Sequence, residues 1–303
     1  MKKFLRAMLV VLALVIGAVA MVGCGGEKDI RVIARDPASG TRDAFESLIA
    51  KDGVELGDAE MIANAEEYSD TVMVKEAVAE SKTAIGYISL GSVDDTVKVL
   101  KVNGVTPSSE TVLDGSYALW RPFVILTNKN VTLTPAVEDF IKFLQSKQAQ
   151  EVVLEKGYVQ QLDENTPDYV KPADMTEIEA GVVNLRGSTS IQPLMTEEGL
   201  IAAYLELTGL DSEHFNVSCT GSGAGKTAVE EDTNGDTIGL SSSALKTEDE
   251  EYATHFNIAL DAVAVIVNNS NELEDVTIEQ IFDIYTGAIT KFSTLLPKTE
   301  EAA

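Results

Sequence analysis

The sequence predicts an α/β protein in which mixed, mostly parallel sheets are flanked by helices. Apolar segments of strand length alternate with amphipathic helical segments along most of the chain, which is the pattern of α/β architecture. In three places an apolar strand runs through a turn of Gly, Ser and Thr directly into a helix. The length of 303 residues is too great for one average domain and suits two.

The first part of the chain carries this alternation from residue 30 onward. The run IRVIA at 30–34 predicts a buried strand, and the helix that follows at 39–53 has Ala44, Phe45 and Leu48 on one face. The next elements in order are a helix at 70–81, a strand at 83–91, a strand and turn at 94–105, a strand at 121–128 and helices within 134–158. The first helix of the last segment has Thr134 and Pro135 in the positions that favour a helix start.

Residues 161–181 interrupt the alternation. They are acidic, contain prolines and show no sustained periodicity, so we interpret them as a linker. After this linker the pattern resumes with strand–turn–helix units at 182–209 and 215–231, a strand and Ser-rich turn at 237–245, a strand at 258–268 and a helix at 277–287.

The N-terminus over residues 1–23 is interpreted as a secretion signal. Three basic residues precede an apolar run that ends in small residues just before Cys24. The stretch MVGCGG resembles a bacterial lipobox, which implies that Cys24 becomes a lipidated first residue, followed by a short tether over 24–29. A single transmembrane anchor stays open as the alternative, because the apolar run is nearly long enough to span a bilayer.

The chain is strongly acidic, with a formal net charge of −26 at pH 7. Removal of residues 1–23 takes away three basic residues and no acidic one, which brings the charge of the mature chain to −29. This argues against nucleic acid as a partner, because nucleic-acid binding depends on phosphate neutralisation by Lys and Arg. It also argues against adhesion to anionic lipid apart from the acyl anchor.

Few residues of the sequence suit metal binding or nucleophilic catalysis. With Cys24 assigned to lipid, Cys219 is the one remaining cysteine, so we expect no intramolecular disulfide. His214 and His255 have no cysteine or carboxylate companions at zinc spacing, and we interpret both as surface or hydrogen-bonded structural residues. We therefore expect no metal, no other cofactor and no catalytic constellation.

The three Gly/Ser/Thr turns, at 39–41, 187–190 and 221–225, are the main functional signal. In a parallel sheet such turns lie at the carboxyl ends of strands, where ligands bind in open α/β folds. The first turn of each following helix has free backbone N–H groups, and small residues let an anion approach them. Arg35 and Arg42 flank the first of these turns, so the sequence predicts an anion site.

The third turn also has to be compared with a nucleotide-binding P-loop. The stretch TGSGAGKT at 220–227 matches G-x-x-x-x-G-K-[ST] except at its first position, where this chain has Thr220. No nearby strand ends in an Asp suited to Mg²⁺, and a lipid-anchored protein outside the cytoplasm has no supply of ATP. A P-loop enzyme is therefore the least favoured function, and Lys226 is expected to be an exposed charge of the first helical turn.

A set of motifs over nearly all of the mature chain resembles the phosphate-binding lipoproteins of bacterial phosphate ABC importers. These motifs are SGTRDAF, AIGYISLGSV, SYALWRPFVILTN, GSTS, GSGAG, IGLSSSALK, IALDAVAVIVN and IYTGAIT. The resemblance implies a two-lobed, periplasmic-binding-protein-like fold of type II, with inorganic phosphate bound between the lobes. It also implies binding without catalysis and delivery of the phosphate to the permease of an ABC importer.

The order of these motifs differs from the usual order in that family. Relatives run from GSTS through TGAIT to SGTR and RPF, whereas here the SGTR half comes first. We interpret the sequence as a circular permutant in which residues 161–181 join the usual end to the usual beginning, an exchange that leaves a packed core intact. The alternative is a misjoining of two gene halves, but the lipobox placed directly before EKDIRVIA and the complete motif set favour permutation.

The resemblance also divides the chain into two lobes that are not contiguous in sequence. Lobe A is expected to comprise residues 28–119 and 259–303, and lobe B residues 120–258, with chain crossings near 119–121 and 258–260.

By motif match, the resemblance implies phosphate ligands on both lobes. They are Arg35, Ser39, Gly40 and Thr41 from one lobe and Thr189, Ser190 and Ser222 from the other. Arg35 is expected to give charge-assisted donors in a planar fork, and the others to give amides and hydroxyls at helix starts. Arg42 is a further candidate, and its alternative is an ion pair with Glu46 four residues along the helix.

Ser242 stands where some relatives carry an aspartate that accepts the proton of phosphate. A serine hydroxyl both accepts and donates, so Ser242 is expected in the site but excludes sulfate less strongly than a carboxylate does. Asp36 and Asp261 are alternative acceptors. The sequence thus predicts a monomeric, lipid-anchored, extracytoplasmic phosphate-binding protein. The alternatives kept open are a binding protein for another tetrahedral oxyanion and a phosphate-sensing surface protein.

Overall fold

The structure is a computed structural model that describes residues 28–196 and 198–296. The expected signal peptide and the lipid attachment at Cys24 lie outside these residues. Among the residues that are described, no helix is both long enough and apolar enough to cross a membrane.

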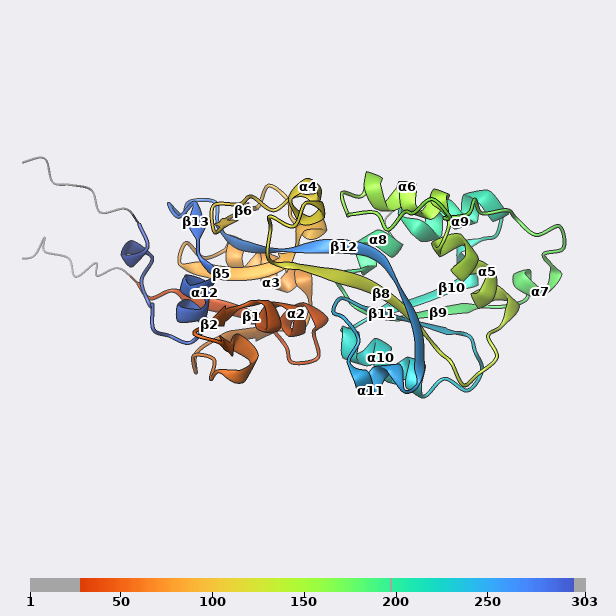
Figure 1. Cartoon of the computed structure of the whole chain (residues 1–303), viewed down its shortest axis with the longest axis horizontal. Helices are drawn as coiled ribbons and strands as arrows, with labels where there is room; N and C mark the ends of the chain where they lie inside the picture. The colour runs from red at the N-terminus through yellow and green to blue at the C-terminus, as the bar shows by residue number, and fades with distance from the viewer. Residues whose placement is uncertain (1–27, 197, 297–303) are drawn as a thin grey trace, which may run out of the picture.

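Two long strands, β8 (Trp120–Asn128) and β12 (Ala253–Asn268), connect two groups of helices and strands (Figure 1). β12 pairs with β8 along its first part, from Ala253 to Ala262, and with β5 (Ala84–Ser89) along its second part. Its register against β8 shifts between Asn257 and Ala259. One continuous strand therefore belongs to the sheet on both sides of the molecule.

The strands form one mixed sheet of nine strands within the part of the chain that is described, in the order β10-β9-β11-β8-β12-β5-β1-β4, with β6 beside β12. The remaining strands of this sheet are β1 (Arg31–Arg35), β4 (Glu66–Tyr68), β6 (Val97–Val99), β9 (Val183–Gly187), β10 (Phe215–Cys219) and β11 (Thr237–Ser241). Two small sheets pair β2 (Ala50–Lys51) with β3 (Val54–Glu55) and β7 (Lys101–Val102) with β13 (Asp275–Val276).

Parallel pairing is confined to the two outer parts of the large sheet. β1 pairs in parallel with β4 and β5, and β9 pairs in parallel with β10 and β11. β8 and β12 form only antiparallel pairs, because each runs back across the molecule between the two parallel groups. The predicted α/β class is confirmed, while the centre of the sheet is antiparallel where the sequence predicted mostly parallel pairing.

Helices pack around the sheet in each of the two groups of elements that β8 and β12 connect (Figure 1). They are α2 (Gly40–Leu48), α3 (Thr71–Ala79), α4 (Ser109–Leu113), α5 (Pro135–Leu144), α6 (Lys147–Glu155), α7 (Thr176–Glu179), α8 (Gln192–Met195), α9 (Leu200–Thr208), α10 (Ser222–Glu230), α11 (Thr247–Glu250) and α12 (Ile278–Tyr285). As the sequence predicts, Thr134 caps α5 by accepting a hydrogen bond from the Val137 amide, with proline in the first turn.

The buried apolar side chains form two large clusters. The first contains Phe45 stacked on Tyr87, with ring centroids 3.8 Å apart, and the second contains Phe140 and Tyr204 in an edge-to-face contact. Along β12, Ala259 belongs to the second cluster and Ala262 and Val263 to the first. We keep the names lobe A and lobe B, as defined above, for the parts of the chain around the first and second cluster.

The segment 161–181 is packed onto lobe B. Its Tyr169 is 8% exposed and donates a hydrogen bond to Asp139 Oδ2 at 2.6 Å, and Tyr204 donates to the same oxygen at 2.8 Å. Met175 and Ile178, the latter within α7, are buried as well. This polar, proline-containing segment is therefore anchored by three apolar side chains that the sequence pattern did not single out.

The two histidines lie in different environments. His214 is 5% exposed, stacks on Tyr204 and has no hydrogen-bond partner for Nε2 within the described ranges, and burial lowers its pKa. His255 is exposed on β12. His255 is thus the expected surface residue, and His214 is a buried structural residue whose packing on Tyr204 involves residues distant in sequence.

Candidate functional site

The three Gly/Ser/Thr turns come together between the lobes. The first follows the end of β1, and the other two follow the ends of β9 and β10. Thr41 Oγ1 and Ser190 Oγ lie 2.9 Å apart, and the Gly223 amide donates to the carbonyl of Ala38 at 3.1 Å. Carboxyl ends of parallel strands from two different lobes therefore face each other at one place, as expected for a ligand site in an open α/β fold.

The turn at 39–41 starts helix α2 and is almost inaccessible to solvent. Ser39 caps the helix, because its Oγ accepts hydrogen bonds from the amides of Thr41 and Arg42. Gly40 packs so closely on lobe B that a Cβ atom there would lie 2.4 Å from Ser222 Oγ. Glycine is thus required at this position for the approach of the two lobes.

Arg35, at the end of β1, is the central charge of the site. Its side chain is 1% exposed, and its guanidinium donates to the carbonyls of Tyr68 and Ser69 at 3.2 and 2.8 Å. It also donates to the hydroxyls of Thr71 and Thr189, at 3.3 and 3.2 Å. All four acceptors are neutral, and burial lowers the pKa of Arg35. Among the residues described, no carboxylate forms an ion pair with this buried cation.

Thr71 is a site residue that the sequence analysis missed. It is 4% exposed at the first position of α3, and its Oγ1 lies 3.4 Å from Thr189 Oγ1 and 3.3 Å from Ser190 Oγ. The signal was present in part, because Asp70 caps α3 by accepting a hydrogen bond from the Met73 amide, much as Ser39 caps α2. The strand before it, β4, has the polar sequence EEY, and for that reason the strand–turn–helix pattern was not seen.

Ser222 and Ser242 close the site from lobe B. Ser222 Oγ accepts from the Ser242 amide at 3.0 Å and lies 3.3 Å from Ser242 Oγ, and both residues are nearly fully buried. Ser242 directly follows β11, so it reaches the same edge of the sheet as Ser222, the first residue of α10. Gly221 has φ 138°, a conformation that favours glycine, in the turn that brings Ser222 to this edge.

Arg42 points to carboxylates of its own lobe. Its Nε donates to Glu46 at 2.7 Å, and its Nη1 donates to Glu67 and to the carbonyl of Arg35. The structure therefore favours the second of the two roles considered for Arg42, the pair with Glu46.

Lys226 differs from the sequence expectation. It was expected to be an exposed charge, but its side chain is 15% exposed and its Nζ lies 2.7 Å from Asp249 Oδ2. The partner is on α11, distant in sequence, so the turn at 220–227 gave no sign of the pair. With its lysine held by a carboxylate, this turn lacks the free cation that a P-loop offers to phosphates.

The alternative acceptors Asp36 and Asp261 are both near the site but in different states. Asp261 is fully engaged: its Oδ1 accepts from Ser89 Oγ at 2.9 Å and its Oδ2 from Arg121 at 3.0 Å. Burial raises the pKa of Asp261, against the opposing effect of Arg121. Asp36 accepts from the Ala38 amide through Oδ1, while its Oδ2 is buried without a partner in the described ranges. Asp36 is therefore the carboxylate with a free acceptor atom.

The site offers donors and no metal ligands. In the described part of the chain, no group of three or more His, Cys, Asp or Glu residues is placed to hold a metal ion. A buried arginine, several hydroxyls and two helix N-termini can instead surround a small anion.

Comparison with known proteins places the chain in a family. A model of the PBP superfamily domain matches residues 23–148 and 174–302. "Phosphate-binding protein PstS 2" of Streptococcus pneumoniae serotype 4 (strain TIGR4) is 35% identical over 302 residues, which cover 96% of this chain and 99% of that one. "Phosphate-binding protein PstS 2" of Streptococcus agalactiae serotype V is 32% identical over 310 residues, covering 97% of this chain and 99% of that one.

A solved structure gives the same result. The crystal structure of a phosphate ABC transporter, phosphate-binding protein from S. pneumoniae TIGR4 has a TM-score of 0.64 and 36% identity to this chain. The match extends over 88% of this chain and 100% of the chain in that crystal structure. The resemblance stated from the sequence is thus confirmed, whereas the circular permutation stays a prediction. The chain belongs to the PBP superfamily, in the family of the streptococcal PstS 2 proteins.

Proposed function

We propose that the chain binds inorganic phosphate between lobes A and B and delivers it to an ABC importer, without catalysis. The proposed ligands are Arg35, Ser39, Gly40, Thr41 and Thr71 of lobe A and Thr189, Ser190, Ser222 and Ser242 of lobe B. Arg42 is left out of the first group because two glutamates already engage it. The relatives are named as phosphate-binding proteins, which supports phosphate as the anion.

One observation carries this proposal: Arg35 is a buried cation whose partners are all neutral. Burial of a charge without an ion-pair partner is costly, so such a residue is best explained by an anion that joins it. Hydroxyls of both lobes are within hydrogen-bond distance of one another there, and an anion would take over those bonds. Since the ligands come from both lobes, anion binding favours the arrangement in which the lobes meet.

The preference for phosphate over sulfate is assigned to Asp36. Phosphate keeps a proton near neutral pH and sulfate does not, so a buried acceptor favours the protonated anion. Asp36 Oδ2 is an unpartnered acceptor in the same turn as Arg35 and Ser39. Ser242, whose hydroxyl both donates and accepts, does not have to supply this selectivity.

Calorimetric titration of the purified chain with phosphate, sulfate, molybdate and ATP tests the proposal. We expect tight binding of phosphate, much weaker binding of sulfate and molybdate, and no hydrolysis of ATP. Equal affinity for sulfate would point to the alternative, a binding protein for another tetrahedral oxyanion. Absence of phosphate binding would contradict the proposed function.

We further propose that the protein works as a monomer outside the cytoplasm, held to the membrane by lipid on Cys24 and bound to the permease when loaded. The lobes would be residues 28–119 with 259–303 and residues 120–258, related to the usual family order by circular permutation. Replacement of Cys24 by Ser tests the anchor: release from the membrane supports lipidation, and retention supports a transmembrane anchor. A phosphate-sensing role with the same site is separated from transport by phosphate uptake in a strain that lacks the gene.

The substitution Thr71→Val is expected to lower phosphate affinity about fivefold, since it removes one hydroxyl contact from the buried site and keeps the side-chain shape. The start of α3 does not depend on this hydroxyl, because Asp70 is the residue that caps the helix. Isothermal titration with phosphate measures the effect. The control Thr208→Val removes a buried hydroxyl of α9, bonded to the Tyr204 carbonyl at 2.7 Å, and is expected to leave affinity unchanged. Equal losses in both variants would assign Thr71 a structural role only.

A further inference from the structure

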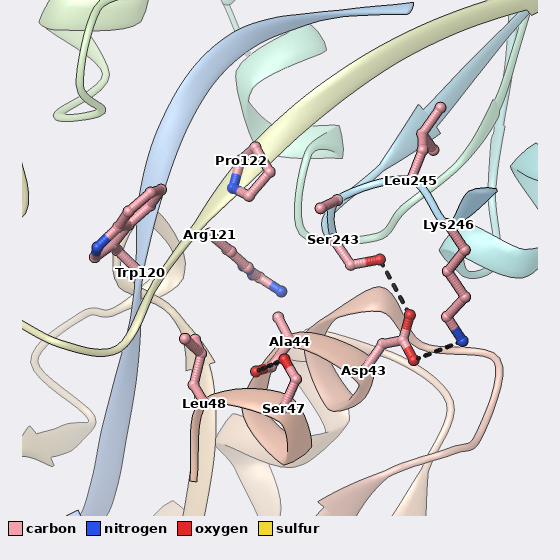
Figure 2. Close-up of a pocket in the computed structure, with 11 residues that line it drawn as sticks. Asp43, Ala44, Ser47, Leu48, Trp120, Arg121, Pro122, Ser243, Leu245 and Lys246 are labelled. Atoms are coloured by element: carbon pink, nitrogen blue, oxygen red, sulfur yellow. Dashed lines mark hydrogen bonds and ion pairs between the residues drawn. The ribbon is translucent and has the colours of Figure 1, made fainter. Parts of the chain in front are cut away.

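A second pocket lies between the lobes, beside the anion site. It has a volume of about 410 Å³ and is lined by residues of α2, of β8 and of the loop after β11: Asp43, Ala44, Ser47, Leu48, Trp120, Arg121, Pro122, Ser243, Ala244, Leu245 and Lys246. Figure 2 shows these side chains arranged around the opening, with α2 on one side and the 243–246 loop on the other. None of the ligands proposed for phosphate lines it.

Arg121 supplies this pocket with a donor that none of the described residues accepts. Its side chain is 1% exposed, and its Nε and Nη2 both donate to Asp261 Oδ2, at 3.2 and 3.0 Å. Its Nη1 is buried without a hydrogen-bond partner in the described residues. Figure 2 shows the guanidinium pointing into the space between Ala44 and Ser243. A buried N–H of a guanidinium that lacks an acceptor is costly, so an acceptor is expected to complete it.

The charges around Arg121 favour an anionic acceptor. Asp261 accepts from Ser89 through Oδ1 and from Arg121 through Oδ2, so both of its oxygens already have partners other than Arg121 Nη1. Burial lowers the pKa of Arg35, and the positive charge of Arg121 adds a smaller effect in the same direction. Asp261 is the carboxylate that pairs with Arg121. A carboxylate on Nη1 would form a charge-assisted bond, the stronger kind available to a guanidinium.

The remaining lining favours an apolar body on the same ligand. Leu48, Trp120, Pro122 and Leu245 form most of the wall, and Trp120 is 40% exposed. The polar residues Asp43 and Lys246 form an ion pair with each other at 3.5 Å, and Asp43 also accepts a hydrogen bond from Ser243 at 3.3 Å, so these charges are already paired at the rim of the pocket. Ligand pockets of this kind combine an apolar wall with a few placed polar groups.

We propose that this pocket is a second binding site, separate from the anion site, for a small monocarboxylate with an apolar chain. The carboxylate accepts a hydrogen bond from Arg121 Nη1, and the chain packs on Trp120 and Leu48. Such a ligand touches α2 of lobe A and the 243–246 loop of lobe B together.

Trp120 provides the readout, because it is the single tryptophan in the sequence. Titration of the full chain with hexanoate, which does not absorb where tryptophan is excited, is expected to change the fluorescence saturably. Hexanamide, which has the same chain and no charge, is expected to bind at least about 10-fold more weakly, since it loses the charge assistance. Equal binding of the two would overturn the assignment to a carboxylate, and a linear, non-saturating response would overturn the site.

Two variants tie the signal to the pocket. Arg121→Lys keeps a cation opposite Asp261 and removes the fork, so hexanoate affinity is expected to fall about 10-fold. Ser47→Phe places a ring at the exposed rim and is expected to block hexanoate even if Arg121→Lys folds poorly, while Ser47→Ala is the matched control that leaves binding intact. Unchanged affinity in Ser47→Phe would place the binding elsewhere.

A last arm separates the two sites. The hexanoate titration is repeated with saturating phosphate, and the fluorescence change is expected to remain. Loss of the change by simple competition would overturn the second site and would instead make Arg121 part of the phosphate site. The first hexanoate titration does not depend on the proposed function, because it is carried out without phosphate.

Discussion

Replacement of Arg35 by Ala is expected to lower phosphate affinity by about 100- to 10,000-fold and to leave the chain folded. The guanidinium would give an anion at least two charge-assisted hydrogen bonds, each worth about 1.5–3 kcal/mol, and 1.4 kcal/mol corresponds to a tenfold change. Without phosphate the same guanidinium is a buried charge held by four neutral acceptors, so its removal does not break an ion pair. The loss therefore falls on binding far more than on the free energy of unfolding.

Two measurements on the same sample separate these effects. Calorimetry gives the phosphate affinity, and thermal unfolding gives Tm with and without saturating phosphate. The Tm shift reports binding because a ligand that binds only the folded state stabilises it by an amount that grows with the logarithm of the ligand concentration divided by Kd. We expect a Tm close to the native value without phosphate and a greatly reduced shift with it. Arg186→Ala is the matched control, since Arg186 lies on β9 and donates to the carbonyl of Asn216 outside the site. Native-like affinity in Arg35→Ala would mean that the site is misplaced.

The partners of Arg35 show what sequence could predict about this site. The turns that contain Ser39, Gly40, Thr41, Ser190 and Ser222 were found because each lies just after an apolar strand, in a local pattern that is visible in one sequence, and the family resemblance then implied these residues as ligands. Thr71 was missed although it occupies the same position after β4. The strand EEY is polar because β4 is the last strand of the sheet, so the local pattern lacks its apolar half.

The expectation for Lys226 was wrong and the packing of His214 was not foreseen, and both have one physical reason: the deciding partner is distant in sequence. Lys226 is held by Asp249 of α11, and His214 is packed on Tyr204 of α9. The few residues around the lysine and the histidine do not predict either contact. Helix and strand positions, in contrast, follow from periodicities that extend over five to fifteen residues and were predicted along most of the chain.

The arrangement of the strands in the sheet was predicted less completely than the individual helices and strands, again because it depends on contacts between residues distant in sequence. The strand expected at 258–268 begins five residues earlier, because Ala253 to Asn257 pair with β8 although His255 and Asn257 are exposed. A polar, exposed segment does not show the apolar run by which the rest of β12 was recognised. The antiparallel centre of the sheet depends on which strands pair with β12. The sequence of one strand does not show which distant strand it pairs with, so this pairing could not be predicted.

Gly40→Ala is expected to lower phosphate affinity roughly 10- to 100-fold through the contact between the lobes. The added Cβ would lie 2.4 Å from Ser222 Oγ and 2.9 Å from both Ser222 Cβ and Ser242 Oγ, all of which belong to lobe B. Contacts this short have to be relieved, and overpacking of a well-packed site costs about 1–3 kcal/mol. The cost arises only when lobe A meets lobe B, so it opposes the arrangement that holds phosphate.

The same substitution is expected to preserve or slightly raise the stability of the chain without phosphate. Gly40 is the first residue of α2, and alanine is favoured over glycine in helices by up to about 1 kcal/mol. Stability and affinity should therefore change in opposite directions, which a general loss of folding does not produce. Thermal unfolding and calorimetry on one preparation measure both quantities.

Gly223→Ala provides the matched control for the interface. Gly223 is on α10 and faces Ala38 of lobe A, where an added Cβ would find its nearest atom, the Ala38 carbonyl oxygen, at 3.5 Å. This is an ordinary van der Waals distance, so phosphate affinity is expected to stay within about threefold of the native value. If Gly40→Ala bound phosphate as tightly as Gly223→Ala, the close approach of Gly40 to Ser222 would not belong to the phosphate-bound arrangement. The ligand set from lobe B would then have to be reassigned, while the role of Arg35 in lobe A would stand on its own test.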